Sequence, residues 1–336
     1  MAQAGVSISK WILTLGCVSI LASCSTPDKK TDTPPELPVV KNVVQVPDFN
    51  ADSTYSFIKT QVDFGPRVPS TKAHEKCAEW YINKLKSYGL AVHVQEGTVT
   101  DYENRSMKIK NIMGSFNPGS KARIVLFSHW DSRRIADDDS VRKNEAIDGA
   151  DDGASGCGVM LEVARQIAKV SPQIGVDVMF LDAEDTGEPH SLAMAKHTED
   201  AWCLGTQYWT KNLPPDYHPR FGILLDMVGA KNATFPMEAN SMAFASDYVK
   251  KIWQEAADIG FSNFFLYTED GQITDDHFYI NRDAKIPTVD IINYNSVTGG
   301  FGSYHHTHAD NMSIIDRNTL KGVGQTLLQV IYSEKP

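Results

Sequence analysis

The stretch that decides the fold is VDVMFLDAED, residues 176–185, in which a mostly apolar run ends in three carboxylates within four residues. Two further segments repeat this pattern: IVLFS, residues 124–128, leads into His129-Trp130-Asp131, and GILL, residues 222–225, leads into Asp226. Short apolar, β-branched runs with abrupt ends are typical of buried strands in a parallel or mixed sheet. In open α/β sheets, ligands bind outside the carboxyl ends of the strands. Carboxylates gathered there would repel one another without a cation, so the sequence predicts a metal enzyme.

Helical patterns alternate with these strands. Their order predicts an α/β fold, a three-layer α/β/α sandwich around a central mixed, mostly parallel sheet. We find no internal repeat and no second domain. The expected helices span residues 52–62, 71–88, 154–170, 239–260 and 316–332, and the other expected strands span residues 91–96, 109–115 and 286–292.

Composition narrows the class of protein. The chain has 336 residues, a formal net charge of -10 and 42% hydrophobic residues, which suits a folded acidic domain rather than a disordered chain. No Lys/Arg-rich block is present, so we expect no nucleic-acid partner. The five cysteines include no Cys-x-x-Cys pair, so a thiolate zinc centre is disfavoured. A metal would therefore use oxygen and nitrogen ligands.

The N-terminus reads as a targeting segment. Lys10 precedes an apolar stretch, residues 11–22, that is too short to span a bilayer as a helix. It ends in Leu-Ala-Ser-Cys24, which resembles a bacterial lipoprotein box and implies cleavage before a lipidated Cys24. The alternative is an ordinary signal peptide in which Cys24 is incidental. We predict a periplasmic protein that is anchored to a bacterial membrane through Cys24, with a signal peptide at residues 1–23, a flexible tether at 24–46 and one domain at 47–336.

Two acidic motifs carry the predicted chemistry. Asp151-Asp152-Gly153 precedes a helix and can direct carboxylates into the strand-end cleft, although helix capping alone would also explain it. Glu184 and Asp185 directly follow a buried strand. Neighbours on an extended segment point to opposite sides, so one could ligate a metal while the other faces the substrate. One carboxylate would then hold a Lewis acid and the second would shuttle protons. A surface turn is the alternative interpretation.

Three further positions could join this site. His306 lies between His305 and His308 in a loop rich in Gly and Tyr, which favours a metal ligand among them. Asp226 ends a predicted strand, but it could instead cap a turn. Asp275 precedes Asp276-His277 and could equally mark the start of a helix.

The order of these motifs resembles the zinc aminopeptidase superfamily. The resemblance is closer to the animal-type glutaminyl cyclases found in some Bacteroidetes, and it covers most of the chain, residues 52–332. Each motif alone is weak, whereas six in order are specific. The matching motifs are SHWD at residues 128–131, FLDAED at 180–185, WCLGTQYW at 202–209, LLDMVG at 224–229, TDDH at 274–277 and GFGSY at 300–304.

The resemblance implies a glutaminyl-peptide cyclotransferase with one Zn²⁺ per chain. Such an enzyme converts the N-terminal glutamine of peptides and proteins to pyroglutamate and releases ammonia. We expect a monomer that meets the membrane only through its lipid. His129 matches an aminopeptidase ligand that the cyclases retain without using it for metal. The implied zinc ligands are Asp152, Asp185 and His306; the implied general base and acid is Glu184, with Asp226 and Asp275 in a hydrogen-bonded network beside it.

The predicted substrate pocket departs from the family pattern. His305 stands where a tryptophan usually precedes the metal-binding histidine. A second pocket tryptophan is replaced in a loop, residues 186–194, that contains His190. Phe301 remains where a pocket aromatic residue is expected, and Trp202 is a further pocket candidate. We therefore expect a more polar pocket, which affects specificity and rate more than reaction type.

Two other functions fit the same residues. A two-zinc aminopeptidase would use His129, Asp152, Asp185, Asp226 and His306, all of which are present. It would hold two zinc ions and release free N-terminal residues. A lipoprotein that binds metal without catalysis is the third possibility, but it would not need the proton-shuttling glutamate.

Overall fold

The computed structural model describes residues 45–189, 192 and 198–336. A six-stranded sheet lies at the centre of the described domain, with strand order β1-β2-β4-β3-β5-β8. A parallel two-stranded sheet, β6-β7, lies outside it. The strands are β1 (Ala91–Thr100), β2 (Ser106–Phe116), β3 (Arg123–His129), β4 (Gly175–Leu181), β5 (Gly222–Asp226), β6 (Phe235–Met237), β7 (Phe265–Glu269) and β8 (Thr288–Ile292).

The central sheet is mixed, as predicted. The β4, β3, β5 and β8 strands are parallel, whereas β1 and β2 form an antiparallel pair, and β2 runs antiparallel to β4. Parallel pairing places His129 opposite Leu181 and Phe127 opposite Leu224. The carboxyl ends of β3, β4 and β5 therefore meet at one edge of the sheet, which brings together the polar residues that follow them.

Helices cover both faces of the sheet, so the predicted three-layer sandwich is confirmed. They are α1 (Ala51–Asp63), α2 (Lys72–Ser87), α3 (Ala154–Lys169), α5 (Leu204–Lys211), α6 (Ala239–Asp258), α7 (Asp276–Tyr279) and α8 (Arg317–Ser333), with a π-helix η1 (Ile280–Ala284) and 3₁₀ turns η2 (Ser296–Thr298) and η3 (Met312–Ile314).

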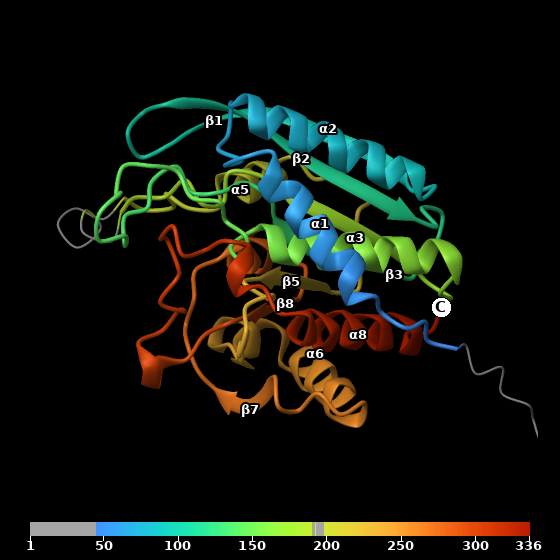
Figure 1. Cartoon of the computed structure of the whole chain (residues 1–336). Helices are drawn as coiled ribbons and strands as arrows, with labels where there is room; N and C mark the ends of the chain where they lie inside the picture. Colours follow the sequence, from blue (N-terminus) through green and yellow to red (C-terminus); the bar gives the residue numbers. More distant parts are fainter. Residues whose placement is uncertain (1–44, 190–191, 193–197) are drawn as a thin grey trace, which may run out of the picture. The chain divides into compact units, whose positions relative to one another are not determined.

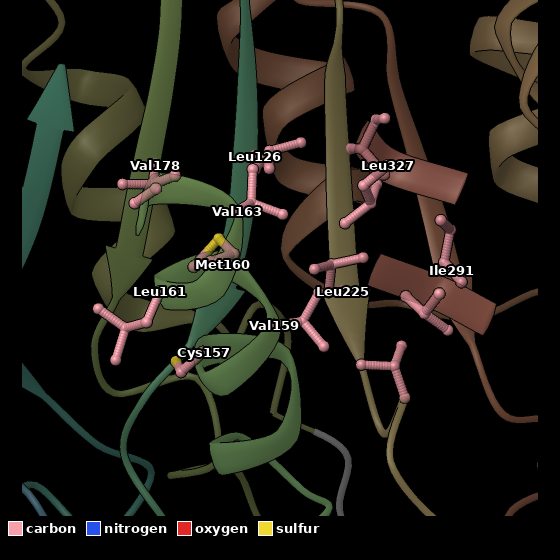
Figure 2. Packing of buried hydrophobic residues seen from close by; sticks show 14 of the residues in the cluster. Leu126, Cys157, Val159, Met160, Leu161, Val163, Val178, Leu225, Ile291 and Leu327 are labelled. Atoms are coloured by element: carbon pink, nitrogen blue, oxygen red, sulfur yellow. The ribbon is translucent and has the colours of Figure 1, made fainter. Parts of the chain in front are cut away.

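The two faces of the sheet are packed differently. On one face, α1, α3 and α8 pack together over alternate strand residues (Figure 1). Figure 2 shows Leu126 and Leu225 from the sheet facing Val159 and Val163 of α3. On the other face, a smaller cluster joins the intervening strand residues to α5 and η1. Alternation along each strand explains this division.

The predicted helices agree with the structure to within a few residues. The elements α5, β6 and β7 were missed: α5 has only eight residues, β6 has three, and β7 is largely exposed. The last strand begins at Thr288, two residues later than expected, because Pro287 has no N–H for the ladder. Among the described residues, none of the helices combines the length and apolarity that a bilayer crossing requires. The predicted signal peptide, and all of the tether but its last two residues, lie outside the described residues.

Candidate active site

A cleft of about 810 Å³ opens at the carboxyl edge of the sheet. Most of the residues singled out from the sequence line it, although they come from segments as far apart in the chain as Asp152 and His306. His190 lies outside the described residues. The predicted site residues on the cleft wall are Asp152, Glu184, Trp202, Asp226, Asp275, Phe301, His305 and His306.

Three of these segments bring possible metal ligands together. One ligand atom each from Asp152, Asp185 and His306 lies within 4.8 Å of the others, and all three residues are buried. The Nε2 atom of His306 is 3.3 Å from Asp185 Oδ1 and 3.8 Å from Asp152 Oδ2. Asp185 Oδ2 is buried and has no hydrogen-bond partner among the described residues. Two carboxylates and one imidazole suit a catalytic zinc, which keeps a fourth position open.

Neighbouring groups hold this triad in place. The Asp310 carboxylate accepts hydrogen bonds from the backbone N–H groups of Asp151 and Asp152, at 2.7 and 3.1 Å. The buried Arg133 guanidinium donates to Asp185 Oδ1 at 3.2 Å. These contacts orient the carboxylates before any ligand binds, as outer-shell partners do in metal sites.

The protonation of His306 suits metal binding. Burial, together with the positive charge of Arg133, lowers the pKa of the His306 imidazole to about 4. The ring is therefore neutral at neutral pH, the form that ligates metals. Burial and the charge of Asp152 raise the pKa of Asp185 well above its usual value. A divalent cation would relieve this repulsion.

The segment after β4 is a turn, so the prediction of an extended segment was wrong. Ala183 has φ 52°, in the left-handed region. The Asp131 carboxylate accepts the N–H groups of both Glu184 and Asp185, at 3.0 and 3.2 Å. This turn still sends the two carboxylates to different places, because Asp185 joins the triad and Glu184 lines the cleft.

A second set of contacts ties this turn to the start of α5. The Asn111 side chain accepts from Asp182 N and donates to Gly205 O, at 3.0 and 2.9 Å. A Cβ atom on Gly205 would lie 1.9 Å from Asp182 O, so only glycine permits this approach. The turn that carries Glu184 is therefore fixed by close packing from outside the cleft.

Glu184 has an acidic environment. An oxygen of Glu184, an oxygen of Asp275 and the sulfur of Cys203 lie within 4.8 Å of one another. The Cys203 thiol donates to Glu184 Oε1 at 3.3 Å. Burial, with the charges of Asp275 and Asp185, raises the pKa of Glu184 well above its usual value. A carboxyl group with a raised pKa can both accept and return a proton near neutral pH.

His129 lies between two carboxylates. Its Nε2 atom is 3.0 Å from Asp152 Oδ1 and 3.1 Å from Asp226 Oδ1. The same three residues form a second group that could hold a metal ion. Both distances are also hydrogen-bond lengths, so a proton on His129 Nε2 that is shared between Asp152 and Asp226 would explain them without a cation. The positions alone thus accommodate either one metal or two.

Aromatic rings form part of the cleft wall. Trp202 stacks parallel to His306, with ring centroids 5.9 Å apart, and the Arg133 guanidinium lies over the Trp202 ring, 4.7 Å from its centroid. His305 stacks on His306 at 3.6 Å and contacts Phe301 at 4.5 Å. His305 thus lies on the cleft wall.

The sequence interpretation gave no role to several supporting residues. Asp131 was noted only as part of a motif, and Asp310 was assigned no role. Arg133 was missed, although an arginine close to the acidic run at residues 137–139 is a detectable signal. Asp137 was missed as well, and its Oδ1 lies 3.5 Å from His306 Nδ1.

Comparisons of this chain with a family model and with solved structures agree on one protein family. Residues 111–331 match the model of peptidase family M28. The chain is 49% identical to the glutaminyl cyclase of Bacteroides thetaiotaomicron, whose crystal structure contains N-acetylhistamine; the match covers 87% of this chain and 100% of that one, with a TM-score of 0.84. A Zn-dependent exopeptidase from Parabacteroides distasonis is 48% identical, covers 86% and 100% of the two chains, and has a TM-score of 0.84.

A curated animal protein agrees with this result. The glutaminyl-peptide cyclotransferase of Bos taurus is 27% identical over 264 residues, which cover 70% of this chain and 68% of the bovine protein. The resemblance that the motifs predicted is therefore confirmed. The chain is an enzyme that belongs to peptidase family M28 and, within that family, to the glutaminyl cyclases.

Proposed function

We propose that this chain is a glutaminyl-peptide cyclotransferase that acts on peptides and proteins with an N-terminal glutamine. One observation carries the proposal: Glu184 lines the same cleft as Asp152 and His306, which form a possible metal-ligand group with Asp185. Cyclisation needs these two functions together, because the amide carbonyl must be polarised while a proton moves from one nitrogen to another.

The metal-ligand group would hold one Zn²⁺. The unpartnered oxygen of Asp185 and the neutral ring of His306 fit a divalent cation. Bound zinc would supply Lewis-acid polarisation of the glutamine side-chain carbonyl. Zinc dependence of a solved relative supports this assignment.

Glu184 is the group that would move the proton. The α-amine nitrogen of the substrate attacks its own side-chain amide carbon, so a C–N bond forms and closes a five-membered ring. Glu184 takes the proton that the amine loses and gives it to the departing amide nitrogen, which leaves as ammonia. Amine and amide belong to one residue, so holding them in an attack geometry removes much of the entropic barrier. Asp226 and Asp275 would hold a further proton beside Glu184, since burial raises their pKa values to about 6 and 7.

An ammonia assay tests the function directly. The purified chain should release ammonia from glutamine-initiated peptides, and chelation should stop the release until zinc is restored. A two-zinc aminopeptidase would instead free the N-terminal residue and hold two zinc ions, using His129 as a ligand. Absence of ammonia from any such peptide would refute the proposal.

The pH dependence of kcat/KM should change when the negative charge of Asp275 is removed. Because the pKa of Glu184 is raised, Glu184 becomes protonated and inactive as the pH falls through a value above the usual range for glutamate. Asp275→Asn removes one cause of that shift, so the acidic limb of kcat/KM should move to lower pH. The measurement is a pH profile of ammonia release, with the exposed Asp216→Asn as control. An unmoved limb would contradict the role of Asp275.

Replacing His305 tests its place in the pocket. A tryptophan there would extend the aromatic wall formed with Phe301, and an added aromatic contact of this kind is worth about 0.5–1.5 kcal/mol. His305→Trp should therefore lower KM by roughly two- to tenfold for substrates with an apolar second residue. Steady-state kinetics would measure it, with His308→Trp as the control in the same loop. An unchanged KM would exclude His305 from substrate binding.

We also propose lipid anchoring through Cys24, on the sequence pattern alone. The full chain should take up labelled fatty acid and sediment with membranes, whereas Cys24→Ser should do neither. Labelling that persists in the variant would contradict the proposal.

A further inference from the structure

One thiol lies beside the proposed catalytic base. Cys203 is buried at the start of α5, and its Sγ atom is 3.3 Å from Glu184 Oε1. An oxygen of Asp275 completes a group in which all three ligand atoms lie within 4.8 Å of one another. This group differs from the Asp152, Asp185 and His306 group because it contains sulfur.

The separations match those of ligands around a bound soft cation. Zinc binds sulfur at about 2.3 Å and carboxylate oxygen at about 2.0–2.2 Å, so a tetrahedral site places sulfur and oxygen roughly 3.5 Å apart. The Cys203–Glu184 distance is already 3.3 Å.

An unsatisfied carboxylate points to the same place. Asp275 is 4% exposed, and its Oδ2 atom has no hydrogen-bond partner among the described residues, whereas its Oδ1 atom caps α7 by accepting from Asp276 N. A buried carboxylate oxygen without a donor is costly, and a cation would satisfy it.

We propose that Glu184, Cys203 and Asp275 form an inhibitory site for a second, thiophilic divalent cation such as Cd²⁺ or excess Zn²⁺. Binding replaces the thiol proton by a metal–sulfur bond, and the proton leaves to solvent. The cation also engages the Glu184 carboxylate, which can then no longer accept a proton from substrate. Inhibition strengthens as the pH rises, because the cation competes with the proton of the Cys203 thiol. The binding site rests on the geometry, and the inhibition rests on the proposed function of Glu184.

Cadmium titration of the zinc-loaded full chain tests the site. A thiolate–cadmium charge-transfer band in the ultraviolet should appear together with loss of ammonia release, while the first zinc remains bound. Cys203→Ser keeps the size of the side chain but removes the sulfur, so it should abolish the Cys203 part of the band. It should also raise the inhibition constant by at least about tenfold, since even outer-shell changes in metal sites cost roughly 10- to 100-fold. Cys77→Ser, a buried thiol away from the cleft, is the matched control.

A second variant keeps the test decisive if Cys203→Ser folds poorly. Asp275→Asn leaves the sulfur in place and should still weaken cadmium binding, as measured by the concentration that gives half of the band. An unchanged band in Cys203→Ser, or inhibition that tracks release of the first zinc, would overturn the inference. A Cys203-dependent band in a chain that never releases ammonia would support the site and refute the cyclotransferase function instead.

Discussion

Glu184→Gln should lower kcat/KM for glutamine-initiated peptides by about a hundredfold to ten-thousandfold, the usual contribution of positioned proton transfer. Glutamine has nearly the same shape but cannot accept the α-amine proton. The backbone N–H of residue 184 would still donate to Asp131, so the turn should persist. The proposed zinc ligands are untouched, and metal content should therefore match that of the wild type.

The measurement combines ammonia release with metal analysis. Glu199→Gln is the matched control, since Glu199 is exposed and lines the same cleft. It should retain near-normal activity. A Glu184→Gln enzyme that keeps more than about a tenth of wild-type kcat/KM would exclude Glu184 as the principal base, because that loss is smaller than general-base catalysis normally supplies.

His306→Ala should remove both zinc and activity. His306 supplies the nitrogen of the metal-ligand group, and its loss leaves two carboxylates and no imidazole. Zinc affinity should fall by on the order of a hundredfold or more, since even supporting residues of metal sites contribute about 10- to 100-fold.

Equilibrium dialysis against a zinc buffer would measure the affinity. His308→Ala provides the control: His308 lies two residues away and bonds Asp139 at 2.9 Å rather than joining the metal-ligand group. It should bind zinc normally. Full zinc affinity in His306→Ala would show that the ion sits elsewhere, and His129 with Asp152 and Asp226 would then be the group to examine.

The fold was predictable because buried parallel strands have a strong local signature. The runs that became β3, β4 and β5 are mostly apolar, and each has an abrupt polar end. The α5 helix was not predictable in this way. It follows Cys203 in a left-handed conformation and spans only eight residues, and its position depends on the contact of Gly205 with Asp182. Such an element is specified by tertiary packing rather than by periodicity.

The candidate site also has a part that local sequence patterns predict and a part that depends on tertiary packing. Strand ends predicted that Asp226 and Glu184 would meet at one edge, because parallel pairing aligns those ends. The ligand set itself came from family resemblance. No local pattern could have shown that Arg133 would pair with Asp185 across 52 positions, or that Asp310 would accept from the backbone of Asp152 across 158. A buried charge is stable only with its partner, and the folded chain supplies that partner.

The clamped turn after β4 has a genetic consequence. Because Asp131, Asn111 and Gly205 determine where Glu184 stands, a substitution at any of them displaces the base without altering a surface that substrate meets. A shift of about 1 Å can cost on the order of a hundredfold in rate. Inactivating alleles should therefore cluster at these remote positions as densely as in the cleft, and soluble, well-folded but inert protein should be their common phenotype.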